Sequence, residues 1–345
     1  MPKDNENIPF LGPIEPTEPQ GFTADQMIRC EECLRASPPT RVTCMYCVAP
    51  LPLTESSARL RKPVLRQPEK HQRGYNNILL PQDQVVTSEI VAEAAALLKL
   101  TPENVQEILD SNMSLPVART ASREEAELVF LRLRDLGLHC MTLSDDDLGV
   151  SSVKRVKSMS FEDDSFTIYQ AGAGEQTTIS WAEITLILPW RLFETRFEIN
   201  ERMTRKPEKE ILDAREFSKD ESVIDFYDAK HSFTWRVNAT AFDFSCLGKD
   251  KALVVNENIR KLQRLIIERA VNAQVDESYT RVRNLLELAW STLPETESSG
   301  WRRERPGKLV VGMATTKSNE IQFTRYSRLR YYFKAKTRNE FDPEE

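Results

Sequence analysis

Two closely spaced pairs of cysteines constrain this chain more than any other feature of its sequence. Cys30 and Cys33 form one Cys-x-x-Cys pair, and Cys44 and Cys47 form a second pair ten residues later. Each pair can occupy a tight turn that aims both sulfurs at one point, and four thiolates at about 2.3 Å complete a tetrahedral shell that suits Zn²⁺ and leaves no position for water. A segment of about 25 residues has too small a hydrophobic core to fold without a cross-link such as a bound metal ion. The sequence therefore predicts a structural, non-catalytic zinc site.

The spacing of the two pairs in residues 27–52 resembles that of a zinc ribbon. Leu34 and Val48 follow the pairs, at positions where zinc ribbons commonly have glycine. The alternatives for the four cysteines are two disulfides or an iron site of the rubredoxin type. Zinc ribbons bind proteins and nucleic acids alike, so the resemblance implies a binding module and does not choose between these partners.

The N-terminal residues 1–26 are polar, acidic and rich in proline, which predicts a disordered tail. They lack the basic start and apolar run of a signal peptide. No stretch of about 18 apolar residues occurs in the sequence, so we expect no membrane span. These features predict a cytoplasmic protein, and a reducing compartment favours metal ligation over disulfides for paired cysteines.

The 345 residues suffice for two or three domains, and the element pattern predicts an α+β multidomain protein. Residues 53–84 are rich in Arg, Lys and Pro and predict an extended basic linker. Residues 85–148 predict a small α+β module in the order ααβαβ, with Thr87, Thr101 and Ser122 as helix caps. Its βαβ part resembles half of a ferredoxin-like or ribosomal-stalk-like domain, which implies packing or docking and no particular activity.

Residues 150–272 show the alternation of apolar and polar residues that is typical of strands. Seven strands are expected, over residues 153–159, 165–169, 177–188, 192–199, 222–227, 233–237 and 241–246. A charged loop over 200–220 and a helix over 249–270 complete the segment. This order, with Trp181 and Glu183 in the stretch 179–184, resembles a PH-like seven-stranded antiparallel barrel with a closing C-terminal helix. The resemblance implies a scaffold for peptides or lipid headgroups, although the turn 162–164 is acidic where a headgroup site needs basic residues.

Residues 273–345 predict a C-terminal helix over 277–290, a loop rich in Ser, Glu and Pro, and two β-like runs over 309–315 and 320–326. From residue 301 to 338 there are eleven basic residues against two acidic ones, interleaved with aromatic residues. Cations neutralise phosphates while rings stack on unpaired bases. Candidate nucleic-acid-binding residues are Arg325, Arg328, Arg330, Tyr331, Lys334 and Lys336. The alternative is that the aromatic residues pack on the barrel while the arginines face solvent or pair with acidic loops.

No catalytic constellation is recognisable in the sequence. The three histidines are scattered, and there is no P-loop, GxSxG or HExxH motif. Cys140 and Cys246 lie on apolar strands, which predicts buried and inert thiols. We therefore predict a non-catalytic interaction protein with structural Zn²⁺ and a protein partner, and no small-molecule substrate is evident. The alternatives are a nucleic-acid-binding protein and an enzyme with a pocket between the predicted barrel and the C-terminal helix.

Overall fold

The computed structural model describes residues 21–66, 68, 72–170, 175–203, 209–292, 294–305 and 308–341. The chain divides into two compact units, Met1–Lys62 and Pro63–Glu345, and each is described by itself. Most of the predicted disordered tail, residues 1–20, lies outside the described residues. Within the described ranges, no helix combines the length and the apolar content needed to cross a lipid bilayer.

The described part of the first unit contains the cysteine segment with a short helix on either side. Its elements are the 3₁₀ helix η1 (Ala24–Gln26), the antiparallel strands β1 (Ile28–Arg29) and β2 (Ala36–Ser37), and helix α1 (Glu55–Leu60). Helix α1 lies where we predicted the start of an extended linker. It forms because Thr54 caps it by accepting from the backbone N–H of Ser57. The buried Arg61, at the end of α1, donates to the carbonyl oxygens of Pro39 and Pro52 and so fastens the helix to the cysteine segment.

The second unit begins with a three-stranded antiparallel sheet in the order β4-β3-β5 and four helices. The elements are β3 (Tyr75–Leu79), α2 (Ser88–Leu98), α3 (Pro102–Asp110), β4 (Leu115–Thr120), α4 (Arg123–Asp135), β5 (Cys140–Ser144) and α5 (Asp145–Leu148). Thr87, Thr101 and Ser122 cap α2, α3 and α4 as predicted. Strand β3 was missed, because it lies in the predicted linker. It separates β4 from β5, so the two predicted strands of the βαβ stretch are not neighbours.

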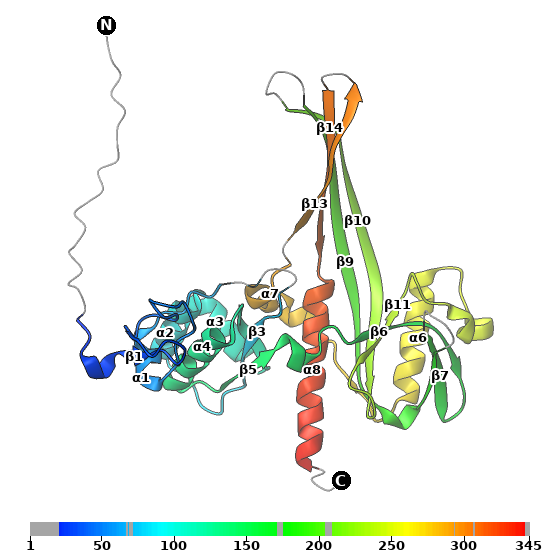
Figure 1. Cartoon of the computed structure of the whole chain (residues 1–345). Coiled ribbons are helices and arrows are strands. Elements are labelled where there is room, and N and C mark those ends of the chain that lie inside the picture. Colours follow the sequence, from blue (N-terminus) through cyan, green and yellow to red (C-terminus); the bar gives the residue numbers. More distant parts are fainter. Residues whose placement is uncertain are drawn as a thin grey trace. The chain divides into compact units, whose positions relative to one another are not determined.

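A large curled sheet in the order β13-β14-β9-β10-β11-β6-β7-β8 makes up most of the rest of this unit (Figure 1). Its strands are β6 (Val153–Phe161), β7 (Ser165–Gln170), β8 (Gln176–Ser180), β9 (Ile184–Met203), β10 (Lys209–Asp228), β11 (Thr234–Asn238), β13 (Glu295–Arg305) and β14 (Lys308–Ser318). A short strand, β12 (Gln274–Val275), adds to β9 in parallel. Strands β11 and β6 also pair in parallel, which corrects the prediction of an all-antiparallel barrel.

The strand boundaries differ from the predicted ones in three places. The 3₁₀ helix η2 (Trp181–Glu183) divides the predicted strand 177–188 into β8 and the start of β9. Most of the predicted charged loop 200–220 belongs to β9 and β10, which pair along almost their whole length. The predicted strand 241–246 is a turn that leads into the 3₁₀ helix η3 (Phe244–Asp250), and helix α6 follows at Val255–Arg269.

The C-terminal part also differs from its prediction. Helix α7 (Tyr279–Ala289) is present as expected, but the predicted Ser-, Glu- and Pro-rich loop contains strand β13. The prediction of a β-like run over residues 320–326 is wrong, because these residues begin the long helix α8 (Glu320–Phe341). Phe323, Tyr326 and Leu329 recur every third residue and are fully buried, which is a helical spacing.

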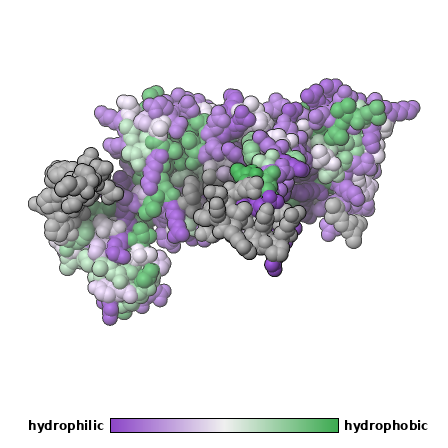
Figure 2. Space-filling view, turned by 90° about the horizontal axis from the view of Figure 1, so that it is seen from above, coloured by the Kyte–Doolittle hydropathy of each residue, from purple (hydrophilic) through white to green (hydrophobic). Residues whose placement is uncertain are grey.

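The middle of the curled sheet is buried on both faces. Alternate residues such as Ile187 and Phe226 face a core that α6 completes. Their neighbours, such as Leu188 and Tyr227, belong to a second core that also contains residues of the small sheet, α7 and α8. The predicted boundaries near 85, 149 and 272 all fall inside this one unit. On the face shown in Figure 2, hydrophobic residues form separate patches among hydrophilic ones.

Candidate metal centre

The four paired cysteines converge on one point in the first unit. The Sγ atoms of Cys30, Cys33, Cys44 and Cys47 all lie within 4.8 Å of one another. The closest approaches are 3.5 Å, between Cys30 and Cys47 and between Cys33 and Cys44. All four are free thiols without a disulfide. Ligands at about 2.3 Å from a tetrahedral ion are separated by distances of this order, so the cluster fits a single metal ion.

The backbone repeats one arrangement around the two pairs. The N–H of Leu34 donates to the carbonyl oxygen of Cys30 at 2.9 Å, and the N–H of Val48 donates to that of Cys44 at 3.1 Å. The N–H of Tyr46 points at the sulfur of Cys44 at 3.4 Å, as a backbone donor to a thiolate would. Each Cys-x-x-Cys pair therefore folds into a tight turn that presents its sulfurs on the inside.

Leu34 and Val48 each directly follow one cysteine pair, and both have a left-handed backbone. Their φ angles are +59° and +63°. This conformation is uncommon for any residue with a Cβ atom and is strongly disfavoured for a β-branched one such as Val48. The side chains of both are more than 60% exposed, so no packing in the unit compensates for the conformation. The convergence of the four sulfurs holds the backbone of these two residues in the left-handed conformation.

The pKa values of two thiols in the cluster are shifted in opposite directions. Burial tends to raise the pKa of Cys44, but donation from the backbone of Cys47 and Tyr46 and from the hydroxyl of Ser37 lowers it to about 6. The backbone of Ala49 donates to Cys47, yet burial and the three neighbouring sulfurs raise the pKa of that thiol to about 12. The Cys44 thiol therefore ionises readily, whereas the neighbouring sulfurs oppose ionisation of the Cys47 thiol. A divalent cation removes this conflict, because it attracts all four thiolates.

Exposed apolar side chains surround the cysteine turns. Leu34, Met45, Tyr46 and Val48 are each more than half exposed, and the guanidinium of Arg35 lies over the ring of Tyr46 at 4.9 Å. Cys30 and Cys44 are buried beneath them. The turns thus combine a closed sulfur cluster with an apolar outer surface. The arrangement could hold a metal ion through the four sulfurs.

The predicted nucleic-acid residues all lie on α8, where several have partners inside the unit. Arg328 donates to the carbonyl oxygens of Leu148 and Ser232, and it is almost fully buried. Arg330 donates to the buried Asp276 at 2.6 Å. The remaining predicted residues are Arg325, which is mostly buried, Tyr331, Lys334 and Lys336.

Tyr331 stacks on the buried ring of Tyr227, with centroids 4.5 Å apart. The guanidinium of Arg328 lies over the same two rings. The ammonium of Lys336 lies over the ring of Tyr332, so cation–π contacts continue along the helix. Nucleic-acid binding by this helix stays a prediction.

The two unpaired cysteines are poorly suited to nucleophilic chemistry. Burial raises the pKa of Cys140 to about 12 and that of Cys246 to about 11, which keeps both as thiols at neutral pH. His231 lies in a turn after β10, where its ring nitrogen is 2.9 Å from the buried Asp228. That carboxylate also accepts from the indole of Trp235, so it holds the turn together. His71 lies outside the described residues.

A cluster of Arg119, Asp145 and Arg325 in the second unit was not anticipated. The carboxylate of Asp145 lies 2.6 Å from the guanidinium of Arg119 and 3.7 Å from that of Arg325. These residues come from β4, α5 and α8, and no local motif joins them. The only signal in the sequence was the position of Arg325 in the basic C-terminal run.

Comparison of the chain with protein-family models, curated proteins and solved structures finds no match. The geometry of the sulfur cluster and of its surroundings is therefore the basis for any assignment.

Proposed function

We propose that this chain is a non-catalytic interaction protein in which residues 27–52 form a zinc ribbon. One observation carries the proposal: four thiol sulfurs within 4.8 Å of one another, with exposed apolar side chains on the turns that hold them. A site with four cysteine ligands has no open position for water or substrate, so the ion stabilises the fold. The exposed side chains of Leu34, Met45, Tyr46 and Val48 would then contact a protein partner.

Zinc is the metal that the donor set favours. Four soft thiolates in a tetrahedral arrangement suit Zn²⁺ or an iron site, and zinc needs no redox partner. Binding of this kind supplies about 10–16 kcal/mol in zinc-finger peptides at neutral pH. The first unit has a core cluster of only a few residues, including two of the cysteines. The ion would therefore be part of the core of this unit.

We further assign the part of the curled sheet from β6 to β11, with α6, to a PH-like scaffold. Two consecutive three-stranded meanders, β6-β7-β8 and β9-β10-β11, and a following helix on one face support this assignment. The other face of β9 and β10 is covered by α7 and α8 and by the small sheet. The scaffold would thus present its loops and edges, or the uncovered face of β6, β7 and β8, to a partner.

Metal content is the first test of the proposal. Native mass spectrometry of the purified, reduced chain should find one zinc ion per molecule. The substitution Cys44→Ser should remove it, because three remaining thiolates bind far more weakly. Iron in place of zinc would contradict the zinc assignment, and an absence of any stoichiometric metal would contradict the ribbon.

Partner binding is the second test, and it separates the surface from the metal. Affinity capture with the intact chain should recover a protein that Met45→Ser/Tyr46→Ser fails to retain while keeping its zinc. A matched control is Leu60→Ser, which replaces an exposed apolar residue on α1 of the same unit. The captured protein is then purified and its affinity for each variant is measured. Equal affinity for the control and the double variant would refute a role for the cysteine turns.

Nucleic-acid binding remains the alternative for the α8 residues. It predicts binding of RNA or DNA whose affinity falls steeply with salt concentration. Fluorescence anisotropy with labelled oligonucleotides at low salt measures this directly. Lys334→Gln/Lys336→Gln tests the two lysines of the predicted set, for which the described residues provide no ion pair to a carboxylate.

A further inference from the structure

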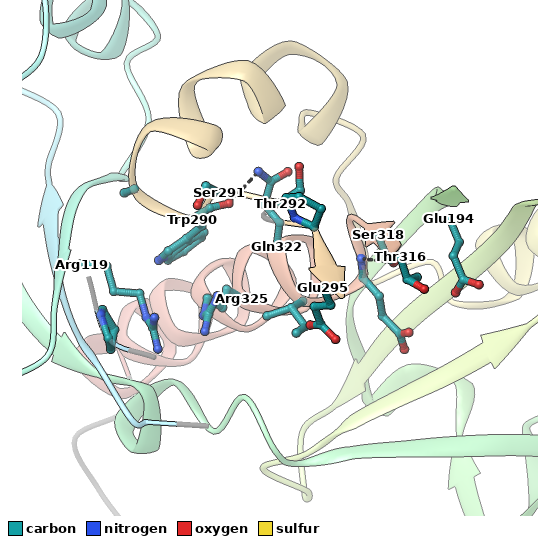
Figure 3. Close-up of a pocket in the computed structure, with 15 residues that line it drawn as sticks. Arg119, Glu194, Trp290, Ser291, Thr292, Glu295, Thr316, Ser318, Gln322 and Arg325 are labelled. Carbon is teal, nitrogen blue, oxygen red and sulfur yellow. Dashed lines mark hydrogen bonds between the residues drawn. The ribbon is translucent and has the colours of Figure 1, made fainter. Parts of the chain in front are cut away.

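A cleft in the second unit is lined by residues from five separated parts of the chain. It lies between the end of α7, the adjoining ends of β13 and β14, the first turns of α8, and Arg119 of β4 (Figure 3). Its volume is about 460 Å³, within the usual range for small-molecule sites. Figure 3 shows Arg119 and Arg325 at one end of the cleft and Glu194 at the other.

The arginine end of the cleft holds two cations and one anion. Arg119 donates to the carboxylate of Asp145 at 2.6 Å, but the nearest approach of Arg325 to that carboxylate is 3.7 Å, too long for a hydrogen bond. Asp145 already accepts from the backbone N–H of Gly74 and from the amide of Asn76. Asp145 therefore accepts three hydrogen bonds, none of them from Arg325, and its single negative charge faces two guanidinium charges.

Arg325 is a buried cation without a hydrogen-bonded partner among the described residues. Its side chain is 12% exposed, and its Nε atom and that of Arg119 both lack an acceptor. Burial and the neighbouring Arg119 lower the pKa of Arg325 to about 10, against the opposing effect of Asp145. A buried N–H donor without an acceptor is costly, and a guanidinium is a strong binding group for an oxyanion.

The other end of the cleft limits what kind of anion could enter. Glu194, Glu295 and Glu320 line it, and although Arg155 and Arg236 pair with Glu320, three carboxylates make this end less favourable than the arginine end for a multiply charged anion such as a phosphate ester. The hydroxyl of Ser291 and the backbone around the end of α7 offer neutral contacts between the two ends. A ligand with one carboxylate and an uncharged or amine-bearing remainder matches this gradient.

We propose that this cleft binds a small molecule through a single carboxylate group, which pairs with Arg325 and Arg119. Arg325 supplies the main contact because its guanidinium is otherwise without an acceptor in the described part of the chain. Arg119 keeps its bond to Asp145 and adds charge. This inference stands on the second unit alone and is independent of the zinc site.

The test uses acetate as the probe and follows the arginine Nε–Hε signals by NMR in the full chain. Acetate should shift the Arg325 signal along a saturating curve, while chloride at matched ionic strength should not. In the variants of Arg325 the curve is read from the Arg119 signal, and Arg325→Gln should weaken the acetate affinity by about tenfold or more, from the loss of charge-assisted hydrogen bonds. The matched control Arg191→Gln removes an exposed arginine on β9 outside the cleft and should leave the curve unchanged.

Several outcomes would overturn the proposal. A linear response that chloride reproduces would mean that no site exists. Saturation by inorganic phosphate in preference to acetate would refute the carboxylate assignment. If Arg325→Gln fails to fold by circular dichroism, Arg325→Lys keeps the charge but loses the planar fork, and an unchanged acetate affinity in that variant would refute the role of the guanidinium.

Discussion

The indole N–H of Trp290 donates to the side-chain oxygen of Asn76 at 2.7 Å, across 214 positions of the sequence. Both residues are buried. The amide of Asn76 in turn donates to the carbonyl oxygen of Leu143 and to Asp145. One asparagine in β3 therefore ties the end of α7 to the small sheet and to the residue that pairs with Arg119.

Replacing Asn76 should destabilise the second unit. Asn76→Leu keeps the approximate volume but leaves the Trp290 indole N–H without an acceptor, and an unsatisfied buried donor costs about 1–3 kcal/mol. Urea unfolding followed by far-ultraviolet circular dichroism measures the loss. Asn272→Leu is the control, since that exposed amide makes only one long bond to Ala182. A loss no larger than that of the control would contradict the linking role.

Relieving the backbone of a cysteine turn should stabilise the first unit. Val48 has a φ of +63°, and a left-handed conformation costs a residue with a Cβ atom about 1–2 kcal/mol. Val48→Gly should therefore raise the free energy of unfolding by about 0.5–1 kcal/mol after the entropy of glycine is subtracted. Zinc competition against a chromophoric chelator should show tighter binding.

Val42→Gly is the matched control for that change. Val42 lies in the same segment and is partly exposed, but it is not among the residues with positive φ. The glycine there should weaken zinc retention, because it adds only conformational freedom to the unfolded chain. Equal effects of the two substitutions would mean that the left-handed turn stores no strain.

Acid should remove the stabilising contribution of Asp145. Burial opposes ionisation of its carboxyl, but the hydrogen bond from Arg119, the charge of Arg325 and the amide of Asn76 lower its pKa below the usual value. A carboxyl whose pKa is lower in the folded state stabilises fully above its unfolded pKa of about 3.9, and this contribution is lost as the pH falls through the folded pKa.

The variant Asp145→Asn tests this linkage. At pH 7 it should be less stable than the parent by about 3 kcal/mol, because two buried arginines lose their shared anion. The difference should shrink as the pH falls below about 4. Urea unfolding at a series of pH values gives the curve, and a difference that is constant across the series would contradict the assignment.

A buried ion pair between β10 and β11 of the curled sheet should be costly to break. Arg236 donates to both oxygens of Asp225, at 2.7 and 2.8 Å, and also approaches Glu320 of α8. Although burial alone would lower it, these carboxylates raise the pKa of Arg236. Asp225→Asn should cost about 3–5 kcal/mol, whereas Asp225→Leu/Arg236→Met should cost much less.

The control for this pair is Arg155→Gln. Arg155 contacts the same Glu320 but is largely exposed, so its removal should change the free energy of unfolding by less than about 1 kcal/mol. The urea midpoints of the parent and of the three variants are compared to measure these losses. Should the single and double substitutions prove equally damaging, the cost would come from packing and not from an uncompensated charge.

Features that depend on neighbours in sequence could be predicted, and features that depend on distant partners could not. The convergence of Cys30 and Cys33 with Cys44 and Cys47 follows from spacing alone, because two tight turns fix four sulfurs. Strand β3 escaped prediction since its buried centre contains Asn76 and Asn77. The side-chain amide of Asn77 donates to the carbonyl oxygen of Ala126 and to the hydroxyl of Thr142. Only the folded chain brings these two residues near Asn77.

The long ribbon of β9 and β10 escaped prediction for a different reason. Between residues 211 and 220 most side chains of β10 are exposed, so the apolar alternation that marks a half-buried strand is absent. Backbone pairing with β9 holds the segment extended instead. In α8, the aromatic and β-branched residues at its start favour a strand by propensity, and packing in the second core overrides that preference.

The placement of β14 beside β9 has a consequence for the order in which the chain is made. Residues of β9 from Glu194 to Met203 pair with β10 on one edge, and their other edge is covered only by β14. A ribosome finishes α6 and α7 before it adds β14. Until then the nascent ribbon carries a row of uncovered backbone donors and acceptors, which is a template for joining other chains. Premature termination between α7 and β14 would leave this edge of β9 permanently unpaired. We expect such a truncated product to aggregate.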